Sequence, residues 1–247
     1  MKNQLNLFFL ALGFFSRIPM PGWVEYSPEK LNHSSRYLVV VGWLLGALVA
    51  AIFFTTHKLF PETISLWLAM GFSLLLTGAF HEDGLADTAD GFGGAFSREK
   101  KLTIMKDSRI GTYGASALIM VLLGKYLLLI ENSDIIIALL IAYPLSRVTA
   151  ISLIADMHYV SDSNTSKSKP LANQLTKTDL AILLTTALPA LFFLPLAHAA
   201  ILLAALIIVR ILAKVYLNKQ IGGYTGDTLG AVQQVSELTI YGVLLAL

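Results

Sequence analysis

Six long apolar runs limit the folds open to this chain, because each is close to the roughly 20 residues that a helix needs to cross a bilayer. Only 14% of its 247 residues are charged, whereas soluble domains carry about 25%. The sequence therefore predicts a single integral membrane domain, residues 1–247, folded as an all-α polytopic bundle of about six transmembrane helices. The expected spans are Tyr37 to His57, Ile64 to Phe80, Tyr113 to Ile130, Ile135 to Ile154, Leu180 to Leu196, and Ala199 to Leu217.

Two shorter apolar runs lie near the ends of the chain. The run from Leu5 to Phe15 is too short to span a bilayer, and Pro19 and Pro21 follow it, so we expect an interfacial or re-entrant helix. Ser16 to Pro19 lacks the small residues of a cleavage site, which argues against a cleaved signal peptide. The run from Leu238 to Leu247 is also too short to cross alone, and we expect it to pack against the bundle.

Basic residues alternate from loop to loop between the expected spans. The turns at Glu131 to Asp134 and Pro195 to His198 hold no Lys or Arg, and the turn before Ile64 holds only Lys58. Cytoplasmic loops are enriched in basic residues, so the basic side is expected to face the cytoplasm. The net charge of +2 and the scattering of these residues give no sign of nucleic-acid binding. The basic side carries Arg98, Lys100, Lys101, Lys106, Arg109, Lys167, Lys169, Lys177, Lys214 and Lys219.

The segment from His81 to Gly91 places four acidic residues directly after the second apolar run. Such a cluster at the edge of a bilayer requires compensating positive charge. Asp83, Asp87 and Asp90 are spaced i, i+4 and i+7, so a helix would project all three from one face. Carboxylate oxygens suit Mg²⁺, Mn²⁺ or Ca²⁺, and we predict a divalent-metal site that bridges the phosphates of a diphosphate substrate. The alternative is a solvated acidic loop paired with nearby lysines.

A second polar segment, residues 106–114, falls on the same predicted membrane face. Lys106 and Arg109 are candidate phosphate ligands, since arginine offers a planar fork and lysine a point charge. Asp107 lies between them and could complete the metal ligands or bind a second ion. The alternative role of the two basic residues is to anchor the end of a span.

A third polar segment, residues 222–230, is rich in glycine and threonine and also falls on that face. Gly223 and its neighbour Thr225 are candidate substrate contacts, because glycine lets the backbone approach phosphate oxygens closely. Asp227 suits a ribose hydroxyl or a metal. Two structural alternatives stay open: the glycines permit close helix packing, and Asp227 caps the helix that follows.

Two cations lie inside expected spans, Lys125 in the third and Arg147 in the fourth. A charge within the membrane normally faces a polar cavity or a buried partner. The sequence names no partner for either residue. His81 could act as a base at neutral pH, or could simply be a polar tip at the membrane interface.

The three polar segments together resemble the cobalamin synthase family, the adenosylcobinamide-GDP ribazoletransferases. The resemblance extends over nearly the whole chain. Glu82 departs from the family pattern, in which an apolar residue is usual, and is either a solvated bystander or an outer ligand. The matching stretches are His81-x-Asp83-Gly84-Leu85-Ala86-Asp87-Thr88-x-Asp90-Gly91, Asp107-Ser108-Arg109-Ile110-Gly111-Thr112, Gly223-x-Thr225-Gly226-Asp227-Thr228-Leu229-Gly230-Ala231, and the early Phe15-x-Arg17-Ile18-Pro19.

The resemblance implies a multi-pass enzyme of the bacterial inner membrane that requires Mg²⁺ and whose active site faces the cytoplasm. It implies transfer of the adenosylcobinamide phosphate group from adenosylcobinamide-GDP to the 3′-hydroxyl of α-ribazole or α-ribazole 5′-phosphate, with release of GMP. Metal ligation would fall to Asp83, Asp87, Asp90 and Asp107, and catalysis to Asp107 and Arg109. Homo-oligomers and association with other cobalamin-pathway enzymes stay open.

Two alternative functions follow from the same residues. The stretch Asp87-x-x-Asp90-Gly91 is distantly similar to the opening of the CDP-alcohol phosphotransferase motif. The Ala-Arg pair and the closing Asp-x-x-x-Asp of that motif are missing, which argues against a phospholipid synthase. A membrane cation transporter would use the acidic cluster as an ion site, but the cluster lies at a span end and no internal repeat is evident.

Overall fold

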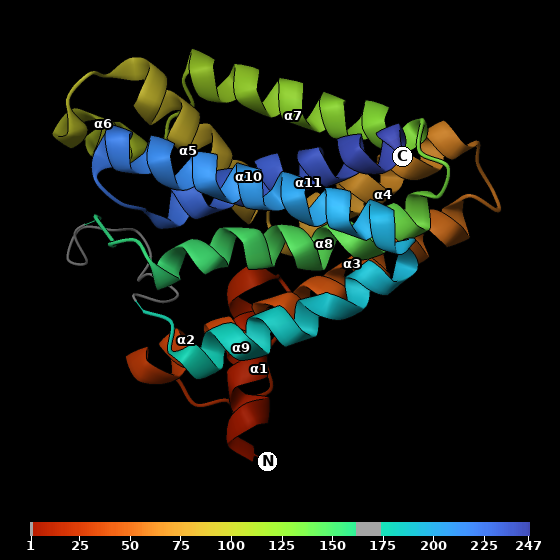
Figure 1. Ribbon diagram of the computed structural model, residues 1–247, viewed down its shortest axis with the longest axis horizontal. Coiled ribbons are helices and arrows are strands. Elements are labelled where there is room, and N and C mark those ends of the chain that lie inside the picture. The colour runs from red at the N-terminus through yellow and green to blue at the C-terminus, as the bar shows by residue number, and fades with distance from the viewer. Residues whose placement is uncertain (1, 162–173) are drawn as a thin grey trace.

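The computed structural model describes residues 2–161 and 174–247, and over those residues it confirms the predicted all-α bundle (Figure 1). Lys167 and Lys169, which entered the topology prediction, lie outside the described residues. Within the described part of the chain, 3-10 helices η1 (Ser35–Tyr37), η2 (Leu153–Ala155) and η3 (Leu188–Phe193) extend or link the α-helices. The α-helices are α1 (Lys2–Phe15), α2 (Pro28–Ser34), α3 (Leu38–Thr56), α4 (Glu62–Thr77), α5 (Phe80–Gly94), α6 (Arg98–Met105), α7 (Thr112–Ile130), α8 (Ile135–Ser152), α9 (Lys177–Ala187), α10 (Leu196–Ile221) and α11 (Gly226–Ala246).

The long helices run side by side, and α8 lies at the centre between α3 and α11 (Figure 1). In the described residues, five helices are long and apolar enough to cross a membrane, or six if the bent pair α4–α5 counts as one span. The peripheral helices α7 and α10 expose large apolar side chains, such as Met120 at 67% and Leu212 at 62%. Exposed apolar side chains on long helices are expected where a bundle faces lipid.

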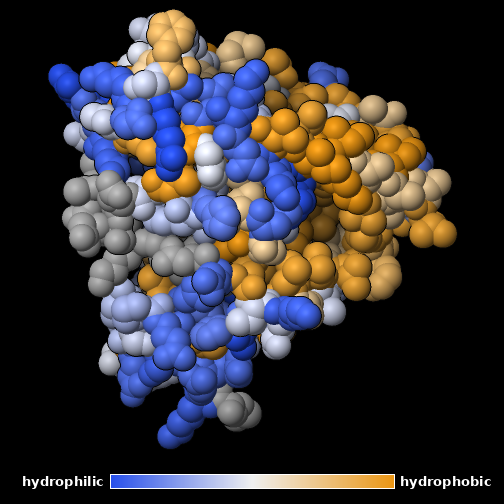
Figure 2. Space-filling model, turned by 60° about the vertical axis from the view of Figure 1, so that its left-hand side comes forward, coloured by the Kyte–Doolittle hydropathy of each residue, from blue (hydrophilic) through white to orange (hydrophobic). Residues whose placement is uncertain are grey.

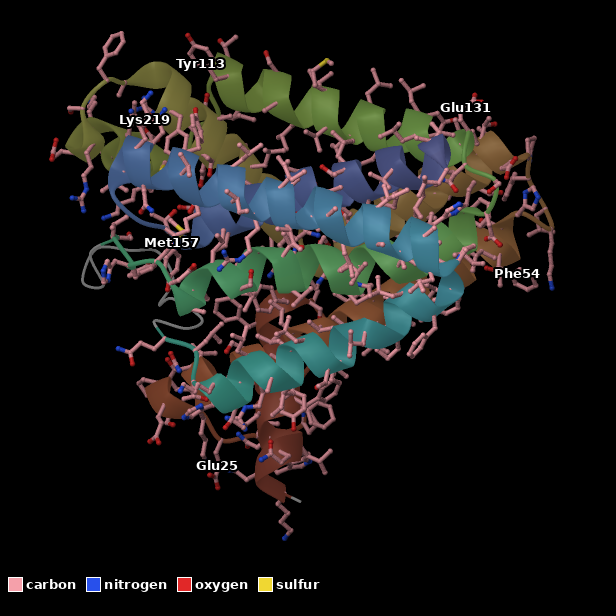
Figure 3. The ribbon with its side chains drawn as sticks, viewed as in Figure 1. Glu25, Phe54, Tyr113, Glu131, Met157 and Lys219 are labelled. Carbon is pink, nitrogen blue, oxygen red and sulfur yellow. The ribbon has the colours of Figure 1, made fainter. Side chains whose placement is uncertain are left out.

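The two ends of the bundle differ in charge, as the sequence predicted. Tyr113, Met157 and Lys219 lie at one end of the bundle, whereas Phe54 and Glu131 lie at the other (Figure 3). When the first end is turned forward, Figure 2 shows hydrophilic residues gathered there and a broad hydrophobic surface beside them. This arrangement is that of a multi-pass membrane protein.

The second expected span, Ile64 to Phe80, is broken by a sharp bend. Helix α4 ends at Thr77, and α5 leaves it at an angle of 84°. Gly78 and Ala79 form the bend with left-handed φ values of 66° and 54°. Gly78 also has the Arg17 side chain against it, because an added Cβ would lie 2.3 Å from Arg17 Nε. Hydropathy alone did not reveal this bend, since the apolar run continues through it.

Two other boundaries differ from the prediction. The run Leu180 to Leu196, expected as the fifth span, is α9 followed by η3 and is not among the described helices that are long and apolar enough to cross a membrane. Pro189 at the start of η3 cannot donate an α-helical hydrogen bond. The prediction of a short C-terminal helix from Leu238 to Leu247 is wrong, because α11 is 21 residues long and begins at Gly226. The first half of α11 is polar but buried, so its residues do not form an apolar run.

Candidate active site

A cavity opens where α8 ends and α11 begins, and residues of all three polar segments line it. Its empty volume is about 1140 Å³, with the space at its open mouth included. Asp83 and Asp87 come from the first segment, Lys106 from the second and Asp227 from the third. The apolar part of its wall includes Phe14, Phe15, Leu38, Phe80, Ala150, Ile151, Ile154 and Leu229.

Helix α5 carries the acidic cluster, so the predicted helical spacing of its carboxylates is confirmed. Asp83 is exposed and Asp87 half-buried, and both line the cavity. Asp90 is buried and is directed instead at the start of α7, where its oxygens accept hydrogen bonds from the backbone N–H groups of Gly111 (2.7 Å) and Gly114 (2.8 Å). These are donors that a helix start leaves unsatisfied. The structure thus separates Asp90 from the two cavity carboxylates.

Glu82 projects into the interior of the bundle and does not line the cavity. It accepts a hydrogen bond from Gln234 Nε2 at 2.9 Å, and Lys125 Nζ lies 3.9 Å from its Oε1. Lys125 forms a closer ion pair with Glu237 of α11. The structure therefore supplies the partner that the sequence did not name for Lys125: a buried acidic residue, as a charge within a membrane bundle requires.

The second segment contributes one residue to the cavity wall, Lys106. Beside it, the exposed Arg109 and the half-buried Asp107 form an ion pair in which Nη2 and Oδ2 are 2.6 Å apart. The hydrogen bond from Arg109 to Asp107 raises the pKa of the guanidinium. The structure does not bring these two residues to the cavity wall, and their predicted catalytic roles stay predictions.

The third segment forms the turn into α11. Thr225 is the N-cap and accepts a hydrogen bond from the Thr228 backbone N–H at 3.2 Å, so the alternative that Asp227 caps this helix is wrong. Asp227 lies in the first turn and lines the cavity. Gly223 is buried against the loop that follows η2, because an added Cβ would lie 2.1 Å from the His158 carbonyl oxygen. This packing supports the structural reading of Gly223, and its substrate contact stays a prediction.

Helices α5 and α11 cross at glycines, which fixes the distance between their acidic residues. A Cβ on Gly84 would lie 2.7 Å from the Asp227 carbonyl oxygen, and one on Gly230 would lie 3.2 Å from the His81 carbonyl oxygen. Small residues at a helix crossing let the backbones approach closely. Asp83 and Asp87 therefore face the same cavity as Asp227.

The cavity carboxylates suit a Mg²⁺ ion that the substrate phosphates would also bind, and not one that protein side chains alone would enclose. Among the described residues, no three His, Cys, Asp or Glu side chains are grouped closely enough to hold a metal. Mg²⁺ commonly binds through one or two carboxylates together with substrate phosphates and waters. Asp83 and Asp87, one helical turn apart at the cavity wall, match that pattern.

A sequence profile of cobalamin-5-phosphate synthases matches residues 7–245 of the chain. This chain belongs to the cobalamin-5-phosphate synthase family. Its relatives include the adenosylcobinamide-GDP ribazoletransferase of Vibrio cholerae, 53% identical over 249 residues that cover 100% of this chain and 95% of the relative. The enzymes of that name from Shewanella pealeana (53% identity; 100% and 97% covered) and Vibrio parahaemolyticus (50%; 100% and 94%) are also similar. No solved structure matches the chain.

Membership of the cobalamin-5-phosphate synthase family makes the chain a transferase of cobalamin biosynthesis, and the cation-transporter alternative is set aside. The structure also adds cavity residues that the motifs did not predict. Gln233 is the main example, a buried polar residue of α11. The sequence marks Arg147 only as a charge within a span, and it too lines the cavity.

Proposed function

We propose that the protein transfers the adenosylcobinamide phosphate group of adenosylcobinamide-GDP to the 3′-hydroxyl of α-ribazole or α-ribazole 5′-phosphate and releases GMP. The names of its relatives support these substrates. The observation that carries the proposal is the convergence of Asp83, Asp87, Lys106 and Asp227 on one cavity. Carboxylates with a nearby lysine are the groups that a metal-bound diphosphate requires.

In the proposed reaction, the 3′-oxygen of the acceptor forms a bond to the phosphorus that carries cobinamide. The bond from that phosphorus to the bridging oxygen breaks, and its electron pair leaves with GMP. We assign Asp227, whose backbone packs against Gly84 of α5, to orient the attacking hydroxyl and to receive its proton. Lys106 offsets the charge of the diphosphate.

Mg²⁺ held by Asp83 and Asp87 would neutralise charge on the phosphates and on the departing GMP. Asp90 is left out of this proposed ligand set because the α7 backbone engages its carboxylate. For Arg109 we propose that Asp107 keeps the guanidinium at the mouth, next to Lys106, from where it binds phosphate when substrate enters. Asp107 acts in this proposal through Arg109 and not as a metal ligand.

The proposed location is the bacterial inner membrane with the cavity open to the cytoplasm. The basic residues of α6, the α6–α7 connection and the end of α10 support this orientation. A cytoplasmic opening also gives a GDP-linked substrate direct access from water.

The test is to incubate the detergent-purified protein with adenosylcobinamide-GDP, α-ribazole 5′-phosphate and Mg²⁺, and to quantify GMP and the corrinoid product. We expect GMP and product in equal amounts, and neither when Mg²⁺ is chelated. Failure to form product under conditions in which the Vibrio cholerae relative is active would refute the proposal. Activity that persists without a divalent ion would refute its metal component.

A further inference from the structure

The two intramembrane cations, Lys125 and Arg147, have different surroundings. Lys125 is satisfied by Glu237 and lies 3.9 Å from Glu82. Among the described residues, no carboxylate lies within 4 Å of the Arg147 guanidinium. Its side chain is 1% exposed and lines the cavity. Glu82 and Glu237 attract the Arg147 guanidinium from a distance, but neither forms a contact ion pair with it. The cavity that the Arg147 side chain lines is therefore where a ligand can bring a negative charge into direct contact with it.

Arg147 also has unused hydrogen-bonding capacity. Arginine carries five N–H donors. Nη1 donates to the Tyr143 carbonyl oxygen at 2.7 Å, and the guanidinium lies 4.9 Å from the centre of the Tyr143 ring. Nε is buried and has no hydrogen-bond partner. A planar guanidinium with spare donors is suited to bind phosphate oxygens.

Gln233, a neighbouring polar residue on the cavity wall, has no comparable capacity to bind an anion. Gln233 donates through Nε2 to Ser146 Oγ at 3.0 Å, and its Oε1 accepts from Gln234 Nε2 at 2.9 Å. Both ends of this amide are therefore engaged by the protein. The anion-binding capacity here belongs to Arg147.

The position of Arg147 separates it from the diphosphate site. Arg147, Ala150 and Ile151 of α8 line the cavity from one face of the helix, and Ile154 of η2 lines it just beyond the helix end. The seven-residue separation puts Arg147 about 10 Å from Ile154 along the helix axis, toward the middle of α8. Because the proposed function assigns the diphosphate to Asp83 and Asp87 of α5, the group left for Arg147 on α8 is a second phosphate of the bound substrates.

We propose that Arg147 binds the 5′-phosphate of the acceptor and makes the enzyme select α-ribazole 5′-phosphate over α-ribazole. This inference rests on the proposed function, in which the same acceptor presents its 3′-hydroxyl to the phosphorus at the carboxylates. A phosphate at Arg147 pairs the buried charge and fixes the depth of the acceptor. An acceptor without the 5′-phosphate leaves the guanidinium unpaired.

The test compares kcat/KM for the two acceptors in the wild type, Arg147→Met and Arg147→Lys. In Arg147→Met we expect kcat/KM for α-ribazole 5′-phosphate to fall by about 10- to 100-fold, mainly through KM, and that for α-ribazole to change by less than about threefold. Arg147→Lys should lose part of the preference, because it keeps the charge but not the fork. If only Arg147→Lys folds, an unchanged preference in that variant overturns the proposal.

The matched control is Arg210→Met, since Arg210 is a helix arginine already bonded to Ser152 and Asp156 and does not line the cavity. Its ratio of the two kcat/KM values should equal that of the wild type. Equal losses with both acceptors in Arg147→Met, with a raised KM for adenosylcobinamide-GDP, would place Arg147 on the diphosphate and overturn the acceptor assignment. Equal losses without that rise would mean a structural role and would also overturn it. A wild type inactive with both acceptors would instead refute the proposed function.

Discussion

Replacing Gly84 with alanine adds one methyl group where α5 crosses α11, and we expect it to slow turnover without preventing folding. The new Cβ would lie 2.7 Å from the Asp227 carbonyl oxygen and 3.0 Å from Asp227 Cα. Ordinary contacts begin at 3.4 Å. Both near atoms belong to backbone, so neither can rotate away, and the two helices must separate by about 0.7 Å.

The size of the expected effect follows from that displacement. Overpacking of this kind costs about 1–3 kcal/mol of stability. The separation also moves Asp83 and Asp87 away from Asp227, and misplacing reacting groups by about 1 Å costs about 100-fold in rate. We therefore expect Gly84→Ala to lower kcat by about 10- to 100-fold.

The assay is GMP release by the detergent-purified variant, together with its thermal unfolding. The control is Gly71→Ala on α4, because a Cβ there would meet nothing within 4 Å. This control should keep wild-type activity and, as a glycine-to-alanine change within a helix, the same or higher stability. Wild-type kcat in a folded Gly84→Ala would refute the argument that this crossing sets the distance between the carboxylates.

Three further predictions concern charges. Lys125→Met should destabilise the protein by about 3–5 kcal/mol, because it leaves Glu237 buried without its cation, and adding Glu237→Leu should restore most of the loss; equal thermal stability of the single and double variants would contradict this. Arg109→Lys should lower kcat/KM for adenosylcobinamide-GDP by about tenfold or more, since a fork becomes a point charge, and an unchanged value would leave Arg109 as an exposed partner of Asp107. Partial burial opposes ionisation of Asp156, but hydrogen bonds from Lys214 and Arg210 lower its pKa below 3.8. The stability that the Asp156 pairs add is therefore complete above that pH and lost as the pH falls through the lowered value. The difference in melting temperature between wild type and Asp156→Asn should thus shrink at acidic pH, and a constant difference would refute this linkage.

Local patterns in the sequence predicted the parts of the site that lie within one helix. The spacing of Asp83 and Asp87 depends only on helical geometry, and α5 is helical as expected. The alternation of basic loops also predicted that the three polar segments share one end of the bundle, where the cavity lies. These inferences required no knowledge of which helices touch.

The features that the sequence did not reveal depend on contacts between distant residues. Asp90 follows the same spacing as Asp83 and Asp87, but Gly111 and Gly114 engage it from α7. Lys125 and Glu237 are 112 positions apart, so their pairing leaves no local pattern. The buried polar half of α11, with Gln233 and Glu237, resembles a loop in hydropathy because its partners lie on other helices.

The most direct test of the central claim is the Mg²⁺ dependence of GMP release in the wild type, Asp87→Asn and Asp90→Asn. If the cavity carboxylates hold the ion, Asp87→Asn should need at least about ten times more Mg²⁺ for half-maximal rate, or lose turnover altogether. Asp90→Asn should keep the wild-type Mg²⁺ midpoint at temperatures where it is folded, while its melting temperature falls because α7 loses a cap worth about 0.5–2 kcal/mol. A shifted midpoint in Asp90→Asn with an unshifted one in Asp87→Asn would contradict the account.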